Sequence, residues 1–66
     1  MKVSPVSLLI LMVRNQPEDG TFLVSDLAEH KGVSREDIYE TLSHLLNMGL
    51  CHRQSYDTYQ LDKSVR

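Results

Sequence analysis

A chain of 66 residues can form one domain at most, and we expect residues 1–66 to fold as a single unit with a small core. Because 41% of the residues are apolar and none is tryptophan, that core must be built mainly from Leu, Ile and Val. Seven lysines and arginines against nine acidic residues give a formal charge of −2. This charge removes the simplest argument for nucleic-acid binding, since non-specific affinity comes from cations that neutralise phosphates.

Cysteine content and hydropathy indicate the compartment. The single cysteine, Cys51, excludes an internal disulfide and a multi-cysteine zinc site, so nothing argues for a secreted scaffold. The apolar run at residues 6–13 is too short to span a membrane, and no small-residue cleavage site follows it. The sequence therefore predicts a cytoplasmic protein with no membrane partner.

The first predicted element is a helix at about residues 5–15, because Ser4 is a favourable N-cap and Pro5 suits the first helical position. Both of its faces are apolar. One face carries Val6, Leu9, Ile10 and Val13, and the opposite face carries Leu8, Leu11 and Met12. The second group is either buried beneath the hairpin or chain end, or it forms a homodimer interface, since an exposed apolar patch usually marks association.

A polar turn at residues 16–20 separates this helix from a short β-prone run, in which we expect an edge strand at about residues 22–24. Ser25 is the expected N-cap of a helix of about two turns. Gly32 stands where a left-handed C-cap residue is needed, so it should end that helix.

The third predicted helix is the most regular element. Ser34 opens it as an N-cap, and Gly49 ends it. Its buried face is formed by apolar residues at helical spacing, namely Ile38, Leu42, Leu45 and Leu46.

The remaining residues predict a β-hairpin. Two short strands are expected at residues 50–54 and 58–61, joined by a turn at residues 55–57. We expect the tail at residues 62–66 to be frayed, as chain ends often are.

Three stretches of this chain carry a family resemblance. Residues 24–29 (VSDLAE) resemble the start of the second helix in that family, and residues 32–34 (GVS) resemble the turn that follows it. Residues 42–50 (LSHLLNMGL) resemble the leucine-rich end of a recognition helix that runs into a wing. With the order helix, edge strand, helix, turn, helix and hairpin, nearly the whole chain resembles the winged helix-turn-helix domains of the MarR and IclR families of bacterial regulators. The resemblance implies an α+β, mostly α fold with three helices and a C-terminal two-stranded wing.

The same resemblance implies a mode of DNA binding. Related helix-turn-helix proteins place the recognition helix in the major groove, and the wing would then touch the backbone or the minor groove. The third helix, at residues 35–48, and the wing would therefore contact duplex DNA. Carried over by position, the implied contacts are Ser34, Arg35, Tyr39, Ser43, Arg53, Gln54 and Lys63.

Acidic residues on the third helix differ from the pattern of DNA contacts that the resemblance implies. The outward centre of the third helix carries Glu36 and Glu40, and Arg35 is its only unambiguous cation. Both glutamates would repel phosphates, although a glutamate can accept a hydrogen bond from cytosine N4. The alternative is a winged-helix interaction module, an adaptor or antagonist of another regulator, that docks a basic protein on this acidic helix or on the apolar first helix.

No metal site, cofactor or catalytic site is expected. Cys51 and His52 are adjacent, and adjacent residues of a strand point to opposite faces, so we expect Cys51 to be a buried or inert thiol. Ser25 and Ser34 are explained as helix caps, and each of the three glycines falls at an element boundary rather than in a phosphate-binding loop. We therefore expect no enzyme. The favoured function is a small DNA-binding transcriptional regulator that dimerises through its first helix.

Overall fold

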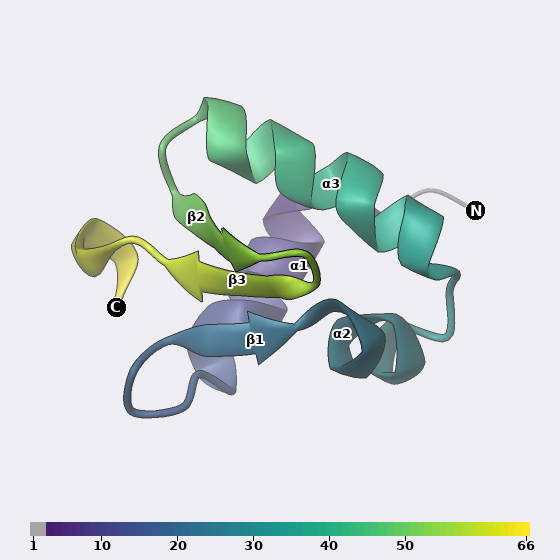
Figure 1. Ribbon diagram of the computed structural model, residues 1–66, viewed down its shortest axis with the longest axis horizontal. Helices are drawn as coiled ribbons and strands as arrows, with labels where there is room; N and C mark the ends of the chain where they lie inside the picture. The colour runs from purple at the N-terminus through teal and green to yellow at the C-terminus, as the bar shows by residue number, and fades with distance from the viewer. Residues whose placement is uncertain (1–2) are drawn as a thin grey trace.

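A computed structural model describes residues 3–66, which form three α-helices and a three-stranded antiparallel sheet (Figure 1). In chain order the elements are α1 (Pro5–Arg14), β1 (Thr21–Leu23), α2 (Val24–Lys31), α3 (Arg35–Asn47), β2 (Cys51–Ser55), β3 (Thr58–Leu61) and the short 3-10 helix η1 (Lys63–Val65). The α+β, mostly helical class that the sequence predicts is confirmed.

Local capping signals begin and end several helices as expected. Ser4 Oγ accepts a hydrogen bond from the Ser7 N–H at 3.4 Å, and Ser34 Oγ accepts one from the Asp37 N–H at 3.2 Å. Gly32 has a φ of 68° at the C-cap of α2, a left-handed conformation that glycine adopts without a steric cost. The first turns of α1 and α3 and the end of α2 are therefore determined by short stretches of sequence.

The second helix begins earlier than the sequence predicts. α2 starts at Val24 with Leu23 as its N-cap, and no side chain in the described chain caps it, so the expected capping by Ser25 is wrong. The reason is that β1 runs into α2 without a loop. The Val24 N–H donates to the Asp57 carbonyl of the hairpin turn at 2.8 Å, which satisfies one of the helix donors that a cap would otherwise serve.

Strand β3 lies at the centre of the sheet, in the order β1-β3-β2. Tyr59 of β3 lies between Phe22 of β1 and Arg53 of β2 in the two antiparallel registers. A bulge between Arg53 and Ser55 precedes the hairpin turn. Such a bulge bends a strand and redirects the side chains next to it.

The expected strands are present with shifted bounds. β2 spans Cys51–Ser55 instead of residues 50–54, so the turn is shortened to residues 56–57. β1 spans Thr21–Leu23 instead of residues 22–24. Because β1 pairs with the free edge of β3, the C-terminal strands belong to a three-stranded sheet and do not form a separate two-stranded unit.

All three α-helices and the sheet contribute to one core. Its buried members are Leu8, Met12, Val24, Leu27, Ala28, Ile38, Leu42, Leu45, Cys51, Tyr59 and Leu61. The predicted buried face of the third helix is confirmed at Ile38, Leu42 and Leu45. Leu46 is only half-buried, because it lies at the border of that face.

α1 buries the face for which the sequence left a dimer interface open. Leu8 and Met12 are completely buried, so their expected exposure at a homodimer interface is wrong, and Leu11 at the side of the helix is half-buried. The exposed apolar residues of α1 are instead Val6, Ile10 and Val13, at 65%, 50% and 36%. Both faces of α1 are apolar, so which of them is buried depends on how α1 packs against α3 and the sheet. The helical pattern alone does not specify this packing.

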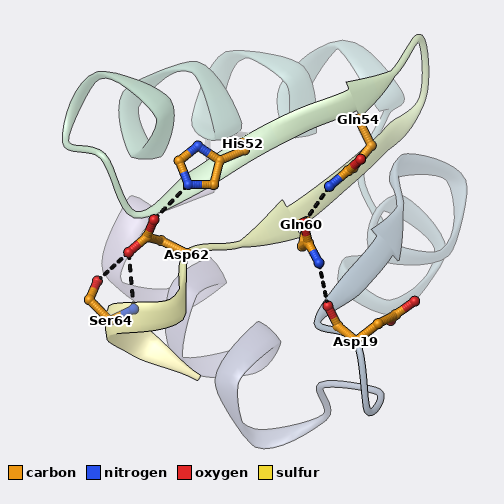
Figure 2. A network of polar contacts seen from close by, with 6 residues as sticks. All are labelled: Asp19, His52, Gln54, Gln60, Asp62 and Ser64. Atoms are coloured by element: carbon orange, nitrogen blue, oxygen red, sulfur yellow. Dashed lines mark hydrogen bonds and ion pairs between the residues drawn. The ribbon is translucent and has the colours of Figure 1, made fainter.

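Side-chain contacts hold the C-terminal end, so the expected frayed tail is wrong. Asp62 Oδ2 accepts hydrogen bonds from the Ser64 N–H at 3.0 Å and the Ser64 hydroxyl at 2.7 Å, while Asp62 Oδ1 lies 2.6 Å from His52 Nε2 of β2 (Figure 2). Arg66 Nη1 donates to the Asp19 carbonyl at 2.7 Å. These contacts join η1 to β2 and to the loop before β1.

Removing the Asp62 carboxylate should destabilise the fold in a pH-dependent manner. The hydrogen bonds from Ser64, with the contact to His52, hold the pKa of Asp62 well below its ordinary value. The resulting stability is complete above the unfolded-state pKa of about 3.9 and is lost as the pH falls through the lower folded-state pKa. We expect Asp62→Asn to lower the urea midpoint at neutral pH, and the difference from wild type to shrink on acidification.

The control is Glu18→Gln, which removes an exposed carboxylate outside this network. It should leave the urea midpoint close to that of wild type. A difference between wild type and Asp62→Asn that stays constant down to about pH 2 would show that the carboxylate charge is not the stabilising group.

Candidate functional site

The outer face of α3 carries charged and polar side chains away from the core. The exposed residues at its centre are Glu36, Glu40, Ser43 and Asn47. Arg35 and Tyr39 lie one turn apart on the flank of α3 that faces the hairpin. The acidic residues and the cation of α3 therefore occupy neighbouring strips of one surface.

Tyr39, Arg53 and Tyr56 form a contact between α3 and the hairpin, which we call the hairpin-tip cluster. The rings of Tyr39 and Tyr56 are tilted by 52°, with their centroids 6.3 Å apart. The Arg53 guanidinium carbon lies 5.9 Å from the centroid of the Tyr56 ring, within the range of a cation–π contact. Tyr56 is 77% exposed, so the cluster presents an aromatic ring to the surroundings.

The guanidinium of Arg53 is held by the backbone of the turn. Its Nε donates to the Ser55 carbonyl at 3.1 Å, and its Nη2 donates to the Tyr56 carbonyl at 3.2 Å. The side chain is exposed, and a guanidinium has five N–H donors, so these two bonds leave donors free for a ligand. Arg53 is thus a positioned cation at the edge of the cluster.

Arg35 adds a second cation beside Tyr39. Desolvation by burial, together with Tyr56 and Asp57, raises the pKa of Tyr39, whereas Arg35 acts in the opposite direction. The Tyr39 phenol therefore stays protonated at neutral pH and can donate a hydrogen bond, as it does to the Tyr56 carbonyl at 3.5 Å. The structure brings Arg35, Tyr39 and Arg53 to one side of the molecule.

The two hydroxyl groups implied as contacts on α3 form hydrogen bonds with the backbone of that helix. Ser34 Oγ accepts from the Asp37 N–H as the N-cap. The Ser43 hydroxyl donates to the Glu40 carbonyl at 2.6 Å, although its side chain is exposed. Both hydroxyls would have to share or exchange these bonds to contact a ligand.

Gln54 and Lys63 lie away from the hairpin-tip cluster. Gln54 Nε2 donates to Gln60 Oε1 on the outer face of the sheet, where Gln60 Nε2 in turn donates to the Asp19 carbonyl at 2.7 Å (Figure 2). Adjacent strand residues point to opposite faces, which separates Gln54 from Arg53. Lys63 belongs to η1, which follows the end of β3 opposite the turn.

Tyr56 is exposed in the cluster and is not among the contacts that the family resemblance implies. A signal for it exists in the sequence, because an aromatic residue in a tight hairpin turn has little core to pack against. Arg53 precedes it by three residues and can therefore reach its ring across the bulge. The contact depends on the turn at residues 56–57, which is one residue shorter than the sequence predicts.

Cys51 and His52 point to opposite faces of β2, as expected. Cys51 is 1% exposed, and burial raises the pKa of its thiol to about 11. His52 faces outward, where Nε2 contacts Asp62. Among residues 3–66, no group of three His, Cys, Asp or Glu side chains is arranged to hold a metal ion.

Comparisons with known proteins add no assignment. No protein-family model matches the chain, and no curated protein or solved structure matches it. Within residues 3–66, each helix is too short or too polar to cross a bilayer.

Cys51 should react slowly in the folded protein. Its thiol is buried and its pKa is raised to about 11, so very little thiolate is present at pH 8. We expect alkylation by iodoacetamide at pH 8 to be at least about 100-fold faster in 8 M urea than in buffer, because unfolding restores both access and a lower pKa. Similar rates in both solutions would contradict the buried position.

Proposed function

We propose that this chain is a small cytoplasmic, non-enzymatic transcriptional regulator that binds duplex DNA in the manner of a winged helix-turn-helix domain. The observation that carries the proposal is the gathering of Arg35, Tyr39, Arg53 and Tyr56 on one exposed side, where α3 meets the hairpin. In this proposal α3 lies in the major groove, and the hairpin turn contacts the DNA backbone.

The arrangement of elements supports the proposal. β1 precedes α2, and β2 and β3 follow α3 and pair with each other beside it. α2 and α3 are joined only by residues 32–34, with Gly32 in a left-handed conformation and Ser34 as N-cap. A short turn of this kind holds the second helix of a helix-turn-helix at a fixed angle to the first.

Charge limits how strongly one copy can bind. Arg35 and Arg53 would each neutralise about one phosphate, so the slope of log affinity against log salt is expected near −2 for a single copy. Glu36 opposes binding where it faces phosphates and favours it where it accepts from cytosine N4. One copy is therefore expected to bind a random-sequence duplex weakly, and tighter binding would require a favourable base contact or more than one bound copy.

Arg35→Ala should weaken binding to a random-sequence duplex and reduce the magnitude of the salt slope by about 1, because one phosphate contact is lost. The measurement is fluorescence anisotropy of a labelled duplex over a series of KCl concentrations. Lys63→Ala is the matched control, since it removes the same charge from the opposite end of the sheet. Equal slopes for wild type and Arg35→Ala would contradict the proposed contact.

A second candidate function is a protein-interaction module. It is favoured by the exposed Glu36 and Glu40 at the centre of α3 and by the formal charge of −2. Such a module would dock a basic protein segment on α3 instead of a duplex. The Tyr39 and Tyr56 rings would then supply apolar contact area beside the acidic residues.

Glu36→Lys separates the two candidates. If α3 faces DNA, the added cation should tighten duplex binding and steepen the salt slope by about 1. If α3 binds a basic segment, the same change should weaken binding of a labelled lysine-rich peptide. Glu36→Gln is the control for loss of charge alone. Duplex binding that is undetectable at low salt in both wild type and Glu36→Lys would contradict the DNA proposal.

A further inference from the structure

The surface between α1 and α2 carries a hollow that the proposed function does not use. Its volume is about 590 Å³, and we call it the basic hollow because Arg14, His30 and Lys31 line it. All of its lining residues belong to α1, to the residue that caps α1, or to the end of α2. The basic hollow is therefore separate from α3 and from the hairpin-tip cluster.

The charges that face the basic hollow are positive. Arg14 comes from the last turn of α1, and His30 and Lys31 come from the last turn of α2. Among residues 3–66, no Asp or Glu lines this hollow. Within the same residues, Arg14 has no hydrogen bond or ion pair, and Lys31 Nζ donates only to the neutral Ser7 hydroxyl, at 2.6 Å. Arg14 and Lys31 therefore face one hollow without an acidic partner.

Helix geometry directs these two cations toward each other. Ser7, Ile10 and Arg14 follow the spacing of one strip along α1, and Lys31 is bound at the Ser7 end of that strip. Helical side chains point toward the N-terminus of their helix, which directs the Arg14 guanidinium back toward the turn of Ile10. That turn and the Ser7 end are only about 5 Å apart along the helix axis. One tetrahedral anion can therefore contact both cations.

The helix dipoles do not explain this arrangement. Cations in the last turn stabilise a helix through its exposed carbonyl groups. That effect acts on each helix separately, and it does not require Arg14 and Lys31 to line the same hollow, where their like charges repel each other. An anion bound between them would replace this repulsion by two attractions.

The amount of positive charge selects the class of anion. A phosphate monoester carries about −1.5 to −2 charges at pH 7 and has three strong acceptor oxygens. Arg14 and Lys31 together supply two positive charges and enough N–H donors for three oxygens, and His30 adds a further ring N–H. A carboxylate would balance the charge of only one of the two cations.

A second hollow, of about 460 Å³, adjoins the basic hollow, since Leu11 and His30 line both. Its walls include the apolar side chains of Leu11, Phe22 and Leu27. Asp26 also lines it and would repel a second anionic group. This adjoining hollow therefore suits an uncharged apolar body and not a second phosphate.

We propose that the basic hollow binds the phosphate group of a small organic phosphate monoester, whose uncharged apolar body lies in the adjoining hollow. Arg14 and Lys31 hold the phosphate oxygens. The site goes beyond the proposed DNA binding and does not depend on it, because α3 and the hairpin contribute no residue to the basic hollow.

A titration followed by NMR tests the site with phenyl phosphate as the probe. The folded, 15N-labelled chain is titrated at constant ionic strength to about 20 mM ligand, which covers dissociation constants in the millimolar range. We expect the amide signals of residues 7–15 and 30–31 to shift, and phenyl phosphate to bind more tightly than inorganic phosphate. Benzoate presents one charge on the same ring, and it should bind at least about tenfold more weakly because it loses a charge-assisted contact.

Variants identify the cations. Arg14→Gln and Lys31→Gln should each weaken phenyl phosphate binding at least about tenfold, since each removes one charge-assisted contact. Lys63→Gln is the matched control, because it removes an exposed cation of η1 and should leave the affinity unchanged. Circular dichroism checks that each variant is folded. Arg14 is exposed, so Arg14→Gln tests the site even if Lys31→Gln fails to fold.

Duplex binding is measured on the same variant to separate the two proposals. Arg14→Gln should keep the wild-type slope of log duplex affinity against log salt, because Arg14 is not expected to contact DNA. A failure of the Arg35→Ala prediction would count against DNA binding alone and would leave the phosphate site in place.

Four results would overturn the proposed site. The first is the absence of any shift at residues 7–15 and 30–31, including the case in which only signals near Arg35 and Arg53 move. The second is benzoate binding as tight as that of phenyl phosphate. The third is wild-type affinity in folded Arg14→Gln. The fourth is a salt slope of duplex binding that falls by about 1 in Arg14→Gln, which would assign this cation to the DNA backbone.

Discussion

The pairing of β1 with β3 is the constraint on which the positions of the other elements depend. β1 passes into α2 without a loop, and the Val24 N–H is bound by the Asp57 carbonyl of the hairpin turn. The start of α2 is thereby fixed to the tip of the hairpin, and α3 follows after a turn of only three residues. A hairpin with a free outer edge would still contact α3 through Tyr39 and Tyr56, but the hydrogen bond to the Asp57 carbonyl that fixes the start of α2 depends on the pairing with β1.

Features that depend on a few neighbouring residues could be predicted from the sequence. Ser4 and Ser34 cap their helices, and Gly32 ends α2, because each effect needs only a local side chain or a permissive φ angle. Ser25 has the same chemistry but no capping role, since a carbonyl from the distant hairpin turn serves the helix first. Long-range hydrogen bonds of this kind leave no pattern in the surrounding sequence.

Tertiary packing decided what the local patterns left open. Both faces of α1 are apolar, and only packing against α3 and the sheet selects Leu8 and Met12 for burial and leaves Ile10 exposed. The candidate site could also be predicted only in part from local patterns. Arg35 and Tyr39 could be selected together from helical spacing, whereas the separation of Arg53 from Gln54 follows from the strand register and the bulge before the turn.

The two carbonyl contacts of Arg53 also affect the entropy of any binding event at the hairpin. A free arginine side chain carries about 2 kcal/mol of rotamer entropy, much of which is lost when it binds a ligand. In this fold the bonds to the Ser55 and Tyr56 carbonyls restrict the side chain before a ligand arrives. Part of the rotamer entropy is thus lost during folding and not on binding. A lysine at this position has no planar fork to bridge two carbonyls, so it would lose that entropy when it binds the ligand.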